Sequence, residues 1–180
     1  MTVREFNYPW YSIVEGDDLE QGDILESCPV FVPPSDLRPE VAGEAQFKWI
    51  AQNLVILSQS CDLVKGTQKL EEVLFCPLYT QIELEWNEAK IEEARKGRFP
   101  GYHLIAPSEE PDFERDVRVV EFRRVYTLPL DFVRTRAADS KRLRLMPPYR
   151  EHLSQAFARF FMRVGLPVDI PPAKRKAKAD

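Results

Sequence analysis

Most of the chain consists of short runs of β-branched and aromatic residues separated by proline, glycine or aspartate. Runs of this kind are typical of β-strands. They predict six strands, at residues 22–32, 48–58, 72–80, 101–107, 118–130 and 142–146. In the fifth run, Glu121 and Arg123 fall on one face and Arg124 on the other, so only one face can be mostly apolar. This pattern predicts a half-exposed strand.

Two segments have the 3.6-residue apolar period of helices. In the first, at 87–97, Asn87 can cap the N-terminus, Gly97 can close the C-terminus, and Trp86 can pack on Ile91. The second is predicted at about 148–165, with Pro148 in its first turn. Its apolar stripe comprises Tyr149, Leu153, Ala156, Phe157, Phe160, Phe161 and Val164. We expect this stripe to pack on the core or to form a homodimer interface.

Together these elements predict a mainly β (α+β) fold, a small antiparallel barrel with a helical insertion and a C-terminal amphipathic helix. With 180 residues, we expect one domain over 1–170 and a basic disordered tail over 171–180. No apolar run approaches the roughly 20 residues of a membrane-spanning helix, and the first residues lack a signal-peptide core. We therefore expect a cytoplasmic protein with no membrane partner. The net charge of -4 gives no global attraction to nucleic acid, although the tail could bind phosphates.

The order "QGDIL", "NLVILSQ" and "VLFCPLYTQIE" resembles the PemK/MazF toxin family, whose fold is an SH3-like barrel. Matching positions are Gly22 and Asp23 at a strand start, Ser58 at a strand end, and Cys76, Pro77, Thr80 and Gln81 on the third strand. The resemblance implies a toxin–antitoxin or phage-defence setting, and it places Thr80 where the family keeps a catalytic hydroxyl.

The family's ribonuclease chemistry also needs an arginine just before the second strand, and this chain has Gln52 and Asn53 there. A neutral amide stabilises charge on a phosphate much less well than a guanidinium does. Cleavage of RNA would therefore require Arg38 or Lys48, from the preceding loop, to take that role.

The stretch "VILSQSCDLV" raises a separate question, because it places Cys61 and Asp62 where a strand ends. A nucleophilic thiolate would need a base such as His103, and the adjacent carboxylate of Asp62 opposes its formation. The favoured interpretation is that Cys61 is a packing residue, slow to alkylate, and that Asp62 bonds to amides in the turn containing Gly66. Four residues of zinc-ligand type occur, Cys28, Cys61, Cys76 and His103, but the chain has no Cys-x-x-Cys pair, so neither a metal nor a cofactor is predicted.

The sequence thus favours a cytoplasmic accessory protein that binds a partner protein or nucleic acid and has no secure active site. Candidate binding residues are Arg38, Lys48, Gln52, Ser58, Asp62 and Gln81. Two enzymatic alternatives remain open: a PemK/MazF-like endoribonuclease with a rearranged site around Thr80, and a hydrolase that depends on Cys61 with His103.

Overall fold

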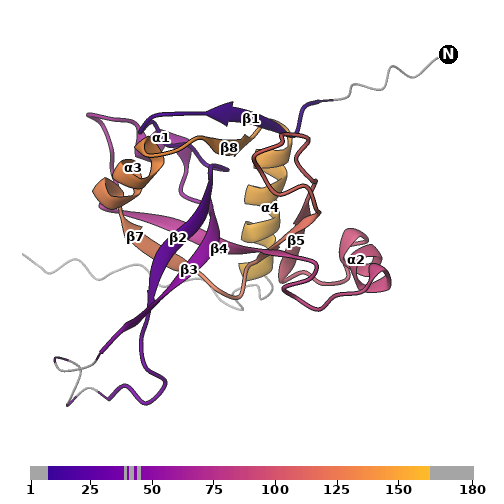
Figure 1. Cartoon of the computed structure of the whole chain (residues 1–180), viewed down its shortest axis with the longest axis horizontal. Coiled ribbons are helices and arrows are strands. Elements are labelled where there is room, and N and C mark those ends of the chain that lie inside the picture. The colour runs from indigo at the N-terminus through magenta and orange to yellow at the C-terminus, as the bar shows by residue number, and fades with distance from the viewer. Residues whose placement is uncertain (1–7, 39, 41–42, 44–45, 163–180) are drawn as a thin grey trace, which may run out of the picture.

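The computed structural model describes residues 8–38, 40, 43 and 46–162. They form eight strands: β1 Tyr11–Val14, β2 Ile24–Val32, β3 Lys48–Ile56, β4 Glu72–Thr80, β5 Tyr102–Ile105, β6 Arg118–Glu121, β7 Tyr126–Pro129 and β8 Arg142–Leu145. The helices are α1 Ser60–Leu63, α2 Glu88–Arg95, α3 Leu130–Ala138 and α4 Tyr149–Phe161 (Figure 1). The predicted mainly β, α+β class is confirmed.

The strands form two antiparallel sheets. The larger has the order β2-β3-β4-β6-β5, with β7 also paired to β4, and the smaller joins β1 to β8. Among the described residues the larger sheet does not close on itself, because β2 and β5 lie at its two ends without pairing. The SH3-like barrel was the finer part of the fold prediction, and this topology leaves it unconfirmed.

The single strand predicted at 118–130 is wrong. The chain makes two separate strands there, and both pair with β4: β6 with residues 78–80 and β7 with residues 72–75. Between them Phe122 is fully buried, while Arg123 and Arg124 are exposed in a turn. The break lets the aromatic ring enter the core while both guanidinium groups stay in water.

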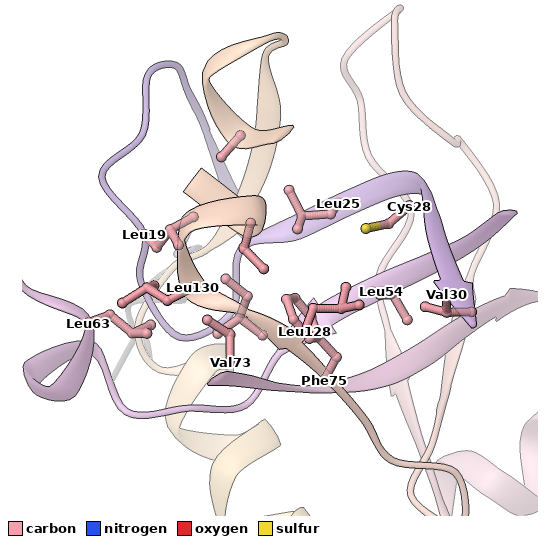
Figure 2. Packing of buried hydrophobic residues seen from close by; sticks show 13 residues of the cluster. Leu19, Leu25, Cys28, Val30, Leu54, Leu63, Val73, Phe75, Leu128 and Leu130 are labelled. Atoms are coloured by element: carbon pink, nitrogen blue, oxygen red, sulfur yellow. The ribbon is translucent and has the colours of Figure 1, made fainter. Parts of the chain in front are cut away.

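Buried side chains cover both faces of the larger sheet. On one face α3 packs over β2, β3, β4 and β7, and Figure 2 shows Leu25, Leu54, Phe75 and Leu128 converging there. This helix was not predicted. Its buried residues Leu130, Val133 and Ala137 do have helical spacing, but the stretch follows a strand without a conventional cap.

The opposite face is covered by α4 and the β1–β8 ribbon. Leu153 is fully buried, and Tyr149, Phe157 and Phe160 pack against the same cluster, whereas Phe161 is exposed. The helix prediction is confirmed over 149–161, and its stripe serves mainly as core. Residues 163–165 of the predicted helix, and the predicted tail at 171–180, lie outside the described residues.

The helical insertion also matches its prediction closely. Asn87 Oδ1 accepts a hydrogen bond from Lys90 N at 2.9 Å, and Gly97 ends the helix with φ of 75°. Trp86 and Ala94 are buried with Val119 in a small cluster of their own. In the described part of the chain, no helix is both long and apolar enough to cross a membrane.

A long-range ion pair and a bulge indicate that the larger sheet is curved. Glu26 on β2 and Arg118 on β6 form an ion pair of 2.6 Å, although β3 and β4 separate their strands. In a flat sheet those backbones would be about 14 Å apart, from a strand spacing of about 4.8 Å. A bulge between Leu25 and Cys28, where Ser27 has φ of 48°, contributes to this curvature.

Candidate functional site

Hydrogen bonds connect the polar stretch from Ser58 to Asp62 with β4 and with the segment that precedes β2. Ser58 is buried, and its hydroxyl accepts a hydrogen bond from Leu74 N at 2.9 Å. Ser60 Oγ accepts from Gln21 N at 3.0 Å, and Gln21 Nε2 donates to Leu57 O at 2.8 Å. These two hydroxyls therefore have structural partners, and the binding role of Ser58 stays a prediction.

Cys61 is not the buried packing residue that the sequence predicted. It lies in the short helix α1 with its side chain exposed, and its Sγ is 3.7 Å from Asp62 Oδ1. The carboxylate of Asp62 pairs with Lys69 Nζ at 3.3 Å. Two of the turn amides that Asp62 was predicted to bind have other partners: Gly66 N donates to Gln68 Oε1 and Thr67 N to Val64 O. Both predictions assumed a simple strand end, whereas the chain forms one turn of helix there and leaves Cys61 in solvent.

Cys61 and His103 line different hollows. Cys61 lines one of about 390 Å³ with Arg150, whose guanidinium is already paired with Glu20 at 2.8 Å and with Glu151 at 3.1 Å. His103 lines another of about 330 Å³, where burial lowers its pKa to about 4. The structure therefore does not assemble the Cys61–His103 pair that a hydrolase would need.

The ribonuclease candidate Thr80 is held in a local turn. Its N–H donates to Glu83 Oε2 at 2.7 Å, and its hydroxyl accepts from Glu83 N at 3.2 Å. The guanidinium in register with Thr80 belongs to Arg118, which is 2% exposed and paired with Glu26. Among the described residues, therefore, no cation is shown at Thr80 in a position to meet a phosphate from solvent.

Two other predicted binding residues, Gln52 and Gln81, are both half-buried. Gln52 Nε2 lies 3.3 Å from Leu78 O and 3.4 Å from Asn53 O. Gln81 lies beside Thr80. Within the described residues no three His, Cys, Asp or Glu side chains are grouped to hold a metal ion.

The Gly–Asp strand start is explained by packing and charge. Gly22 has φ of 87°, and a Cβ there would lie 3.0 Å from Leu145 Cβ. Asp23 is fully buried between Arg142 and Arg144 on β8. A buried carboxylate with two guanidinium partners is satisfied, so this cluster is structural.

A surface with uncovered apolar groups lies elsewhere, on the β2–β3 hairpin. In Figure 1 the outer halves of both strands run away from the body toward the lower left. We call the described residues 31–38, 40, 43 and 46–50 the hairpin arm. Phe31 and Trp49 are directly opposite each other in the strand register, and they are 63% and 65% exposed. Phe47, Leu37 and Ile50 are also exposed on the arm.

The arm forms one wall of an open cleft of about 880 Å³. The other wall is the turn between β6 and β7 together with the start of β7. Lining residues include Phe31, Asp36, Lys48, Ile50, Arg124, Val125 and Tyr126. The sequence pointed to Arg38 and Lys48 of this region as candidate cations, but it gave no sign of the aromatic pair, whose members look like residues of two ordinary strands.

No protein-family model matches the chain, and no curated protein matches its sequence.

Proposed function

We propose that this protein is an accessory binding protein that holds a partner protein on its hairpin arm. The observation that carries the proposal is the exposed pair of Phe31 and Trp49 on adjacent strands. Large aromatic side chains are enriched at interfaces and account for much of their binding energy. Two of them side by side on a protruding hairpin supply the centre of such an interface.

The aromatic pair is suited to this role because it stands on paired strands. Five consecutive residue pairs, from Cys28↔Gln52 to Val32↔Lys48, keep β2 and β3 in register there. A prearranged surface loses little conformational entropy on binding, so more of the contact energy appears as affinity. A flexible loop bearing the same side chains would bind more weakly.

Charge favours a protein over a nucleic acid as the partner. The described arm carries two cations, Arg38 and Lys48, and two carboxylates, Asp36 and Glu40. Nucleic-acid affinity depends on neutralising phosphates, and the whole chain has a net charge of -4. Exposed Leu37 and Ile50 add aliphatic surface that stacks poorly on bases. These features are typical of a protein interface.

The finer fold and setting are part of the same proposal. The Glu26–Arg118 ion pair and the bulge in β2 support an SH3-like, incompletely closed barrel. The resemblance to the PemK/MazF family then implies a toxin–antitoxin or phage-defence role, in which the hairpin arm would hold the partner protein.

Site-specific photocrosslinking tests the proposal. The photoreactive amino acid p-benzoylphenylalanine is placed at position 31 of the full chain, and irradiation is carried out in extract of cells that encode the protein. We expect a discrete protein adduct, reduced at least fivefold when Trp49→Ala is added. The matched control carries the same probe at Ile82, an 80% exposed residue that is not part of the arm and does not line the cleft, and should give no adduct.

The alternatives predict other adducts. A nuclease-sensitive adduct at position 31 would assign the arm to nucleic acid, and an adduct with a second copy of the chain would assign it to self-association. Equal labelling at positions 31 and 82, or labelling unaffected by Trp49→Ala, would overturn the proposal.

A further inference from the structure

The cleft beside the hairpin arm combines apolar lining with a net positive charge. Ile50 and Val125 are 39% and 40% exposed, and both line it together with the half-buried ring of Tyr126. Lys48 and Arg124 line the same space. The cleft thus offers both an apolar surface and two side-chain cations to whatever enters it.

Neither cation has a close carboxylate partner among the described residues. Arg124 interacts with the Tyr79 hydroxyl, its Nε lies 3.9 Å from Glu121 Oε2, at the limit of an ion pair, and its side chain is 61% exposed. Lys48 has no ion-pair partner among the described residues. Asp36 also lines the cleft, which leaves a net charge of +1 there, in a chain whose overall charge is -4. A ligand carboxylate would meet a complementary field at this place.

The edge of β2 just before the arm is a poor place for a partner to add a β-strand. β2 is the last strand of its sheet, but Pro29 has no N–H to donate to a further strand. Recognition in the cleft would therefore depend on side chains. A volume of about 880 Å³ is within the range of sites that bury a ligand of several side chains.

We propose that this cleft binds an extended segment of the partner protein in which carboxylate side chains lie next to apolar ones. The apolar side chains contact Ile50, Val125 and Tyr126, and the carboxylates pair with Lys48 and Arg124. This inference rests on the proposed function, because it names the chemistry of the partner segment that lies alongside the arm. A phosphate chain would also meet the two cations, but it would leave the aliphatic lining uncovered.

Selection from a random peptide library tests the inference even while the partner is unidentified. Phage displaying random dodecapeptides are selected on the full-length protein and counter-selected on the Lys48→Glu, Arg124→Glu double variant. We expect the surviving sequences to be enriched in Asp and Glu beside Leu, Ile, Val or Phe. A synthetic peptide of the consensus, measured by fluorescence anisotropy, should bind the double variant at least tenfold more weakly.

Arg123→Glu is the matched control. Arg123 neighbours Arg124 in sequence, but its guanidinium lies over the Tyr102 ring at 4.9 Å and does not line the cleft. This variant should therefore bind the consensus peptide as the wild type does. A uridine 20-mer RNA serves as the competing probe, since it carries phosphates without apolar side chains.

The outcomes distinguish a failure of this inference from a failure of the proposed function. Selected peptides that are basic or uncharged, or that bind the double variant equally well, overturn the inference. RNA binding that requires Lys48 and Arg124, without peptide binding, also overturns it. If selection fails while the probe at position 31 still forms its Trp49-dependent protein adduct, the arm retains its role and only the acidic-segment chemistry is lost.

Discussion

Asp23, immediately before β2, accepts hydrogen bonds from Arg142 and Arg144 on β8. Arg142 Nε lies 2.8 Å from Asp23 Oδ2, and Arg144 Nη2 lies 2.9 Å from the same oxygen. Asp23 is fully buried and Arg142 is 2% exposed. This contact fastens the β1–β8 ribbon to the edge of the larger sheet.

Asp23→Asn should therefore lower the free energy of unfolding by about 3–5 kcal/mol, because it leaves two guanidinium groups without their buried counter-charge. Urea unfolding at pH 7 measures the loss. Asp17→Asn is the matched control, since Asp17 forms an ion pair with Lys65 in which both side chains are well exposed, and such pairs contribute about 0–1 kcal/mol. Similar losses in the two variants would contradict the structural role of Asp23.

The three cysteines should differ sharply in reactivity. Burial raises the pKa of Cys28 to about 11 and that of Cys76 to about 12, whereas Cys61 is exposed. Iodoacetamide at pH 8 should modify Cys61 alone in the folded protein and all three after denaturation, as located by mass spectrometry. Cys61→Ser should change the free energy of unfolding by no more than about 0.5 kcal/mol. Rapid labelling of Cys28 or Cys76 would show that the described core is wrong.

Acid should destabilise the protein partly through His103. Burial lowers its pKa from 6.5 to about 4, so between these values the unfolded chain binds a proton that the folded chain does not. The free energy of unfolding should fall as the pH drops from 6.5 to 4, by up to about 3 kcal/mol from this residue. Above about pH 7.5 the imidazole is neutral in both states and contributes no pH dependence.

Urea titrations at several pH values, on the wild type and on His103→Phe, isolate this contribution as the difference between the two slopes. His152→Gln removes the exposed histidine of α4 and should leave most of the slope in place. A slope that survives His103→Phe unchanged would mean that the imidazole is well solvated.

Two neighbouring aromatic residues of α4 should respond differently to truncation. Phe157 packs edge-on against the buried Phe122 ring, with centroids 5.5 Å apart, whereas Phe161 is exposed. Phe157→Ala should lower the free energy of unfolding by about 3 kcal/mol, and Phe161→Ala by less than about 1 kcal/mol. Reversal of that order, measured by urea unfolding, would place the interface rather than the core at Phe157.

Local sequence patterns were enough to locate the elements with strong signals. The cap at Asn87 and the stripe through Leu153 and Phe157 each depend on side chains close together in the chain, so both helices were predicted within a few residues. The break at Phe122 was missed because it depends on β4, a distant strand that pairs with two partners in succession. Helix α3 was missed for a similar reason, since tertiary burial of Val133 compensates for a weak local signal.

The site predictions show the same division. The sequence suggested Ser58 and Asp62 as binding residues because it does not reveal their partners. Leu74 N, which donates to Ser58, is distant in the chain, and Lys69 Nζ, which pairs with Asp62, lies across a turn. Phe31 and Trp49 looked like ordinary strand residues, and only the register and the exposure of the hairpin distinguish them from core. Alternation along a strand tells which residues share a face, but not whether anything covers that face.

The pairing of β1 with β8 has a consequence for synthesis of the chain on the ribosome. Tyr11 lies opposite Leu145, so β1 cannot complete its pairing with β8 until residue 145 has been synthesised. Pairings so far apart in sequence close late and slow folding. Until then the apolar face that the ribbon and α4 later cover stays exposed, so the nascent protein is most prone to aggregation, and most in need of a chaperone, just before these last elements emerge.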